Sequence, residues 1–381
     1  MSDKRKKVVL LALTLSGLQN ILGKLDYSKV MLVAMVSDCK EDIDVRVNEI
    51  RIPFYDYSDL DRVLQETNDG DTYYLLCGYR THLREFGVVR KMLKVLGNVK
   101  NDYIVNASLF FETAFVSAYR YAMQGNLDFF ATGISYMMVG LSVTDLPLGC
   151  GANLAASSQD IYYGKEIAKR VLRANSGIKY AFIGLSPYSF SYCLSQSFST
   201  ASMSIPYELL WDTKRYCNEM NQFMKSSLFT DLFTDVELYD PAGPNYLQDV
   251  VLNLNNMLDI DRELSDIVPS GNKLNVAKNK NWLKEYIDLC VKQDCIPIGV
   301  VLPMSPLIQK SYPYEALNEY RSILEDFSLL YNFLYIDLWD VELPMNCFYD
   351  LVHLNKLGAK QITKIIYEKM KEIGLDKKAD K

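Results

Sequence analysis

Cys347-Phe348-Tyr349-Asp350-Leu351-Val352-His353-Leu354-Asn355, near the end of the chain, contains an acid three residues before a histidine, and an apolar helical pattern follows over 359–367. The chain has only two histidines, His82 and His353. Histidine is the usual general base near neutral pH. If the protein uses a histidine for nucleophilic chemistry, His353 is the candidate, with Asp350 placed to hold its far ring nitrogen. The alternative is that Asp350 caps the helix beside a surface histidine.

The composition is that of an ordinary globular protein. The 381 residues are 49% hydrophobic and 23% charged, and the length favours two or three domains. The net charge of −6, without a basic stripe, argues against nucleic acid as a partner. The 27 tyrosines suit a sugar-binding cleft, but ordinary cores and interfaces account for them more simply.

The cysteines and the N-terminal segment indicate the cellular compartment in which the protein works. Eight cysteines are scattered without C-x-x-C pairs, so we expect free thiols in a reducing compartment and no zinc site. The basic start at 4–7 and the apolar run at 8–13 imitate a signal peptide. Because the run is short and a second apolar run follows at 30–36, we interpret it as a buried strand. No run is long enough to cross a membrane, so we expect a cytoplasmic protein without a transmembrane segment.

Strand and helix patterns alternate over the first 105 residues. The apolar run at 8–13 predicts a strand that is covered on both faces, and the runs at 30–36 and 73–77 predict further strands. Helical patterns lie between and after them, at 59–66 and 85–96. The alternation predicts a small Rossmann-like parallel sheet over 1–105.

This module resembles the N-terminal domain of sugar-modifying enzymes such as the bacterial sugar acyltransferases. In those relatives a glycine-rich first turn lets a nucleotide's phosphates approach the backbone. The matching candidates here are Ser16 and Gly17 in the first turn and Asp38 after the second strand. The alternative is a structural or interaction module. His82, in the segment 80–84, is interpreted as part of a solvated loop.

A second α/β domain is predicted over 106–381, beginning with a helix over 106–126. A strand at 127–132 ends in the tight turn Gly133-Ile134-Ser135, and a helix begins at Tyr136. A serine at such a turn lies at the carboxyl edge of a parallel sheet, where open α/β folds place their sites, and backbone N–H groups of the turn can stabilise an oxyanion. The alternative is that Ser135 is only a helix N-cap.

Further strand-to-turn units follow at 151–158, 180–187, 296–303 and 334–338. Together with the turn at Ser135 and the Asp350/His353 segment, they resemble the SGNH hydrolase superfamily, also called GDSL-type esterases, over about 127–370. The resemblance implies a flavodoxin-like α/β/α domain that needs no metal or cofactor for its serine chemistry.

The resemblance also assigns roles. Ser135 corresponds to the nucleophile, and Asp350 and His353 to the acid and the base. In the second block, Asn153-Leu154-Ala155-Ala156-Ser157-Ser158, Ala155 replaces the oxyanion glycine. In the third block, Gly184-Leu185-Ser186-Pro187, Ser186 replaces the oxyanion asparagine. Losing that donor removes roughly 3 kcal/mol of transition-state stabilisation unless Ser186 or Tyr188 compensates.

Branches of the superfamily with this relaxed pattern add or remove acyl groups on bacterial surface glycans. The resemblance therefore implies ester hydrolysis or acyl transfer on a carbohydrate, with the acyl donor undefined. A non-hydrolytic glycan-binding module, or a partner of a glycosyltransferase, is the alternative, and transfer of another group by the same serine is a third. A mainly helical insertion is predicted at 197–278, with helical patterns at 205–228 and 247–264. One interpretation is a lid or a wall that binds the acceptor, and the other is a homodimer interface.

Overall fold

The computed structural model describes residues 5–12, 21–23, 25–37, 44–47, 49–77, 104–106, 114–196, 207, 252, 260–268, 273–331 and 333–375. The chain forms two compact units, Met1–Val116 with Ser195–Glu237, and Ser117–Leu194 with Leu238–Lys381. The predicted division between residues 105 and 106 stays a prediction.

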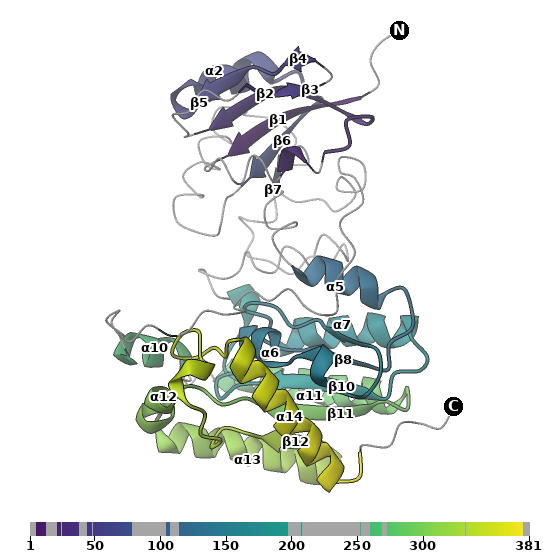
Figure 1. The fold of residues 1–381 in the computed structure, drawn as a ribbon, viewed down its shortest axis with the longest axis vertical. Helices are drawn as coiled ribbons and strands as arrows, with labels where there is room; N and C mark the ends of the chain where they lie inside the picture. Colours follow the sequence, from purple (N-terminus) through teal and green to yellow (C-terminus); the bar gives the residue numbers. More distant parts are fainter. Residues whose placement is uncertain are drawn as a thin grey trace. The chain divides into compact units, whose positions relative to one another are not determined.

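The described residues of the first unit contain a five-stranded sheet in the order β5-β2-β1-β6-β7, in which all pairs are parallel (Figure 1). In chain order these strands are third, second, first, fourth and fifth, which is the Rossmann order. The predicted Rossmann-like sheet is therefore confirmed. Its strands are β1 (Lys6–Ala12), β2 (Val30–Ser37), β5 (Phe54–Asp56), β6 (Thr72–Cys77) and β7 (Ile104–Asn106).

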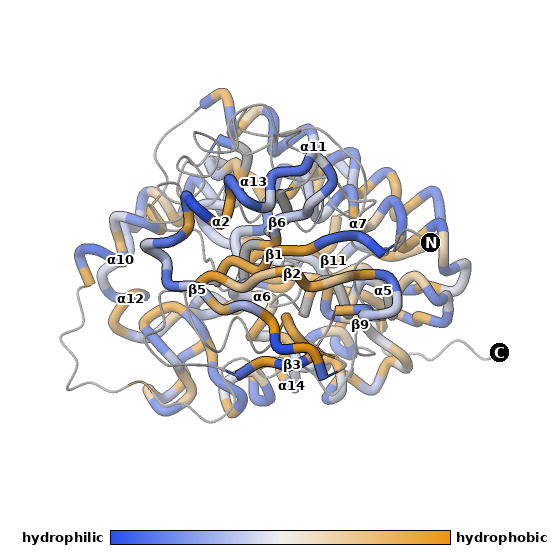
Figure 2. The backbone as a smooth tube through the Cα atoms, turned by 90° about the horizontal axis from the view of Figure 1, so that it is seen from above, coloured by the Kyte–Doolittle hydropathy of each residue, from blue (hydrophilic) through white to orange (hydrophobic). Residues whose placement is uncertain are grey.

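The pattern of apolar residues explains this first sheet. Strand β1 passes from hydrophilic lysines to an apolar run (Figure 2), and Val8, Val9 and Leu10 are fully buried, as a central parallel strand requires. The helix α2 (Leu60–Thr67) buries Leu60, Val63 and Leu64 along one face. The described residues of this unit also form the antiparallel pair β3 (Arg46–Val47) and β4 (Ile50–Arg51) and the 3₁₀ turn η1 (Tyr57–Asp59).

The described residues of the second unit contain a second five-stranded sheet, in the order β12-β11-β10-β8-β9, again with all pairs parallel. In chain order this is 5-4-3-1-2, the flavodoxin order, whose switch point lies between β8 and β10. The predicted α/β class is confirmed here too. The strands are β8 (Phe129–Thr132), β9 (Gly151–Asn153), β10 (Tyr180–Leu185), β11 (Ile296–Val301) and β12 (Leu334–Asp337).

Helices cover both faces of this second sheet. α7 packs against α11, and α11 against α13, on one face, while α6 packs against α14 on the other (Figure 1). The helices are α5 (Ala114–Ala122, which contains the division between the units), α6 (Ser135–Gly140), α7 (Ile161–Ala174), α10 (Ile260–Ile267), α11 (Lys273–Val291), α12 (Pro306–Ser311), α13 (Tyr314–Tyr331) and α14 (Lys356–Glu372). The 3₁₀ turns are η3 (Val143–Asp145), η4 (Leu194–Gln196) and η8 (Met345–Cys347).

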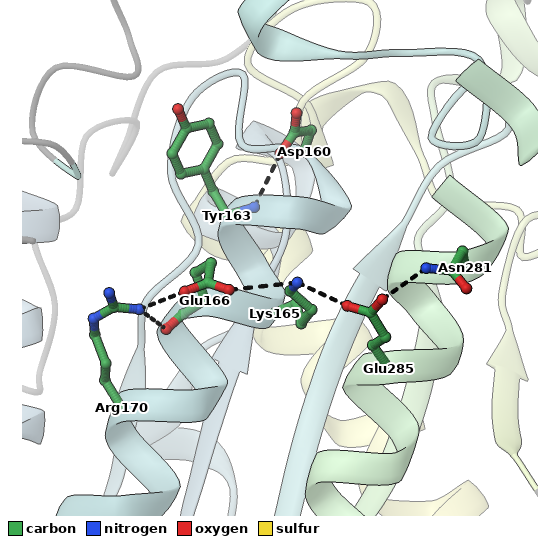
Figure 3. Close-up of polar contacts among 7 residues, drawn as sticks. All are labelled: Asp160, Tyr163, Lys165, Glu166, Arg170, Asn281 and Glu285. Atoms are coloured by element: carbon green, nitrogen blue, oxygen red, sulfur yellow. Dashed lines mark hydrogen bonds and ion pairs between the residues drawn. The ribbon is translucent and has the colours of Figure 1, made fainter. Parts of the chain in front are cut away.

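An ion-pair network links α7 to α11 (Figure 3). Lys165 Nζ lies 2.9 Å from Glu285 Oε2 on α11 and 3.4 Å from Glu166 Oε1. Glu166 also pairs with Arg170 at 2.7 Å. Because the Lys165 side chain is 11% exposed, its contacts are screened less than those between fully exposed side chains, and they add to the packing of α7 against α11.

Several predicted elements have different bounds in the structure. The predicted helix over 106–126 is shorter, because Asn106 belongs to β7 and the helix α5 spans Ala114–Ala122. The helix expected at 205–228 and that at 85–96 lie outside the described elements. Over the described residues, no helix combines the length and the apolarity needed to cross a membrane.

Candidate active site

Ser135 is the first residue of α6 and directly follows the turn after β8. β8 and β10 are the two strands between which the order of the sheet reverses. Ligands of open α/β sheets bind at such a switch point, beyond the carboxyl ends of the strands. The half-buried Ser135 therefore lies where this fold places its sites.

The turn before Ser135 depends on Gly133. Its φ of +139° is a conformation that side chains disfavour, and a Cβ there would come within 2.8 Å of the Cα and carbonyl oxygen of Gly184. Gly184, in β10, in turn leaves room for Met137 of α6. The two glycines therefore let the turn and α6 lie against β10.

His353 and Ser135, which are 218 residues apart, meet in the structure. His353 Nε2 lies 2.8 Å from Ser135 Oγ, and His353 Nδ1 lies 2.8 Å from Asp350 Oδ2. Asp350 thus contacts the ring nitrogen opposite to the one that faces the serine. The geometric condition for a Ser–His–Asp arrangement is met.

The segment that holds Asp350 and His353 is fixed by its own backbone. Phe348 and Leu354 form an isolated antiparallel bridge, and the N–H of Tyr349 donates to the carbonyl of His353 at 2.9 Å. Asp350 Oδ1 accepts from the N–H groups of Val352 and His353 at 2.9 and 2.7 Å. The Asp350 carboxylate therefore orients His353 through the backbone N–H of the histidine as well as through its ring.

The helix that follows this segment begins at a strong cap. Asn355 Oδ1 accepts from the N–H of Gly358 at 3.1 Å, and Asn355 Nδ2 donates to the carbonyl of Asn346 at 2.8 Å. Asn355, and not Asp350, is thus the N-cap of α14, so the capping interpretation of Asp350 is wrong.

Electrostatics favour the ionised form of Asp350. Burial opposes ionisation, but the hydrogen bond and charge of His353 and the two backbone N–H groups lower the pKa of Asp350 below its ordinary value. A second carboxylate, Glu263 on α10, has the opposite shift, since burial and then Asp350 and Asp266 raise its pKa. The site therefore combines one acid that is held ionised with a neighbouring acid that is easier to protonate.

The second block holds α6 in place through Asn153. Asn153 Nδ2 donates to the carbonyls of Met137, Met138 and Leu141 at 2.9, 3.2 and 3.2 Å. Asn153 Oδ1 accepts from the N–H of Ala155 at 3.1 Å. The N–H expected to serve as an oxyanion donor thus has an acceptor within the protein.

The third block contains a cluster of hydroxyl groups. The N–H of Ser186 donates to Ser189 Oγ at 2.8 Å, and the two serine Oγ atoms lie 3.0 Å apart. Tyr188 OH lies 3.4 Å from Tyr136 OH. Burial raises the pKa of Tyr188 to about 12 and that of Tyr136 well above its ordinary value, so both hydroxyls stay protonated at neutral pH.

Three residues that the sequence analysis did not single out contribute to the site. Buried Gln159 accepts from the N–H of Gly133 at 2.7 Å and donates to the carbonyl of Leu154 at 2.9 Å, which ties the turn before Ser135 to the second block. The ring of Tyr136 stacks on His353, and Glu263 interacts electrostatically with Asp350. The position of Tyr136 directly after Ser135 was the one available signal.

The candidates for nucleotide binding, Ser16, Gly17 and Asp38, lie outside the described residues, as does His82. In the part of the chain that the structure describes, no group of three or more His, Cys, Asp or Glu side chains is arranged to hold a metal ion.

Comparison with known proteins gives little beyond this geometry. No protein-family model matches the chain, and no curated protein does. A solved structure described as a platelet activating factor from Streptococcus pneumonia is 8% identical, with a TM-score of 0.36, and the match covers 77% of this chain and 99% of that one. The protein YxiM from Bacillus subtilis is 10% identical, with a TM-score of 0.30, over 66% of this chain and 57% of that one. Similarity at this level supports no functional argument.

Proposed function

We propose that the second unit catalyses ester hydrolysis or acyl transfer through Ser135. The observation that supports this most is the pair of 2.8 Å contacts from His353, one to Ser135 Oγ and one to Asp350 Oδ2. In this mechanism His353 accepts the Ser135 proton while Oγ attacks an ester carbonyl. The leaving alkoxide then takes that proton from His353, and an acyl-enzyme remains.

The second half-reaction decides between a hydrolase and a transferase. Water that His353 deprotonates would release the acid, whereas a sugar hydroxyl at the same place would accept the acyl group. We propose a carbohydrate as the acyl acceptor or ester substrate, in bacterial surface polysaccharide biosynthesis. The support for a carbohydrate is the resemblance of the motifs around Ser135, Asp350 and His353 to those of the SGNH hydrolases.

The oxyanion donors in this proposal are the backbone N–H groups of Ser135 and Ala155 together with Ser186. The bonds from Ala155 to Asn153 and from Ser186 to Ser189 favour a second candidate, a non-hydrolytic glycan-binding module with a degenerate site. In that case the triad geometry would remain without turnover.

Hydrolysis of p-nitrophenyl acetate separates these candidates. The expected result is turnover by the wild type that falls to background in Ser135→Ala and persists in Ser322→Ala, a matched control because Ser322 is exposed on α13. A folded wild type without turnover, with or without added oligosaccharide as acceptor, would favour the binding module. Acetylated oligosaccharide, detected by mass spectrometry, would identify a transferase.

A further inference from the structure

The face of His353 is covered by the residue that follows the nucleophile. The rings of Tyr136 and His353 form a tilted stack, with centroids 5.0 Å apart and an interplanar angle of 31°. Tyr136 is itself held by Tyr188, whose ring meets it edge to face at 6.2 Å and 78°, and the two hydroxyls lie 3.4 Å apart. Tyr136 therefore contacts both the ring of His353 and the ring of Tyr188.

This stack has a consequence for any reaction in which His353 accepts a proton. The imidazole becomes positively charged when it takes the Ser135 proton, and the face of a tyrosine ring attracts a cation within about 6 Å of its centroid. Among the residues that the structure describes, Ser135 and Asp350 contact the ring of His353, and Glu263 on α10 interacts with it electrostatically.

We propose that Tyr136 is a positioning residue that fixes the plane of His353 and stabilises its protonated form through the ring face. This inference rests on the proposed function of Ser135 and His353. It assigns the effect to the aromatic ring and not to the hydroxyl of Tyr136, because the ring contacts His353 while the hydroxyl contacts Tyr188.

The test compares Tyr136→Leu with Tyr136→Phe in p-nitrophenyl acetate hydrolysis across pH. Without the ring, we expect kcat to fall about three- to thirtyfold, with KM changed less. The acid limb of the kcat/KM profile should move to lower pH by about half a unit to one unit, because the protonated ring loses a stabilising contact. Tyr136→Phe should keep kcat within about twofold of the wild type and leave the profile in place.

Tyr162→Leu is the matched control, since Tyr162 of α7 packs against Trp282 of α11, with ring centroids 5.4 Å apart, on the opposite face of the sheet. Thermal unfolding verifies folding, and Tyr136→Met replaces Tyr136→Leu if the latter does not fold. An unshifted profile in the leucine or methionine variant, or a loss in Tyr136→Phe equal to that in Tyr136→Leu, would overturn the inference. These outcomes presuppose an active wild type and an inactive Ser135→Ala, so failure of the proposed function would be recognised separately.

Discussion

Gly133 lies directly against Gly184, so that a Cβ on Gly133 would come within 2.8 Å of the Gly184 Cα and carbonyl oxygen. This approach places the turn that carries Ser135 beside β10. Because both neighbouring atoms belong to backbone, they cannot rotate away, and the contact determines where the Ser135 side chain lies.

Gly133→Ala should therefore destabilise the second unit by about 2–5 kcal/mol, through backbone strain and a steric clash together. Gly70→Ala is the matched control, because Gly70 has a φ of +83° but a Cβ added there would meet no atom within 4 Å. It should lose only about 1 kcal/mol. Urea unfolding measures both values, and an equal loss in the two variants would refute the role of the contact.

Gln159→Leu should cost about 1–3 kcal/mol and lower the activity, because it removes the partner of the buried carbonyl of Leu154 and of the partly buried N–H of Gly133. The control is Gln196→Leu, at an exposed position of η4, with an expected change within about 0.5 kcal/mol. Chemical unfolding followed by fluorescence gives the comparison. A neutral effect of Gln159→Leu would mean that the turn is held by other contacts.

Asp350→Asn should keep the fold and lower kcat by about 10⁴-fold, because the amide can present the wrong hydrogen-bonding group to His353. The pKa of Asp350 is lower in the folded state than its ordinary value of 3.8. The Asp350 carboxylate therefore stabilises the folded state above pH 3.8, and this contribution is lost as the pH falls through the pKa of the folded state. The stability difference between wild type and variant should thus shrink below about pH 4. Unfolding curves between pH 3 and 7 test this, and a difference that grows in acid would contradict it.

Glu263→Gln should increase stability at pH 7, and solvent screening should keep the gain below about 1 kcal/mol. The pKa of Glu263 is higher in the folded wild type than its ordinary value of 4.5. Protonated Glu263 therefore favours the folded state below pH 4.5, and this contribution is lost as the pH rises through the pKa of the folded state. The glutamine of the variant does not ionise, so the variant keeps its stability as the pH rises. Its higher free energy of unfolding relative to the wild type should therefore disappear below pH 4.5. Glu319→Gln on α13, an exposed position, serves as the control, and a pH-independent gain would count against the proximity of Glu263 to Asp350.

Much of the second unit could be predicted because its signals are local. The apolar strands end in small or hydroxyl residues, and the Asp350/His353 pair lies within one short loop whose backbone brings the two side chains together. Parallel strands with helical connections then place Ser135 at the same edge of the sheet.

The supporting contacts could not be predicted in this way. Gln159 reaches the turn at Gly133 across 26 residues, and Tyr136 meets His353 across more than 200. Such contacts depend on the tertiary packing of segments that are distant in the sequence, which no periodicity specifies. Similarly, the Ser189 hydroxyl that accepts from Ser186 follows from the conformation of one loop. The cap of α14 was missed for a different reason, since Asn355, which caps the helix, was not considered beside Asp350, and both residue types cap helices well.

The most direct test of Ser135 as the nucleophile is labelling with an alkyl fluorophosphonate, followed by peptide mass spectrometry. Attack by Ser135 Oγ on phosphorus would form a P–O bond and release fluoride, with the serine proton passing to His353. We predict one adduct, on the peptide that contains Ser135, and its loss in His353→Ala and Ser135→Ala. Folded wild-type protein that forms no adduct, or an adduct that persists in Ser135→Ala, would contradict the mechanism.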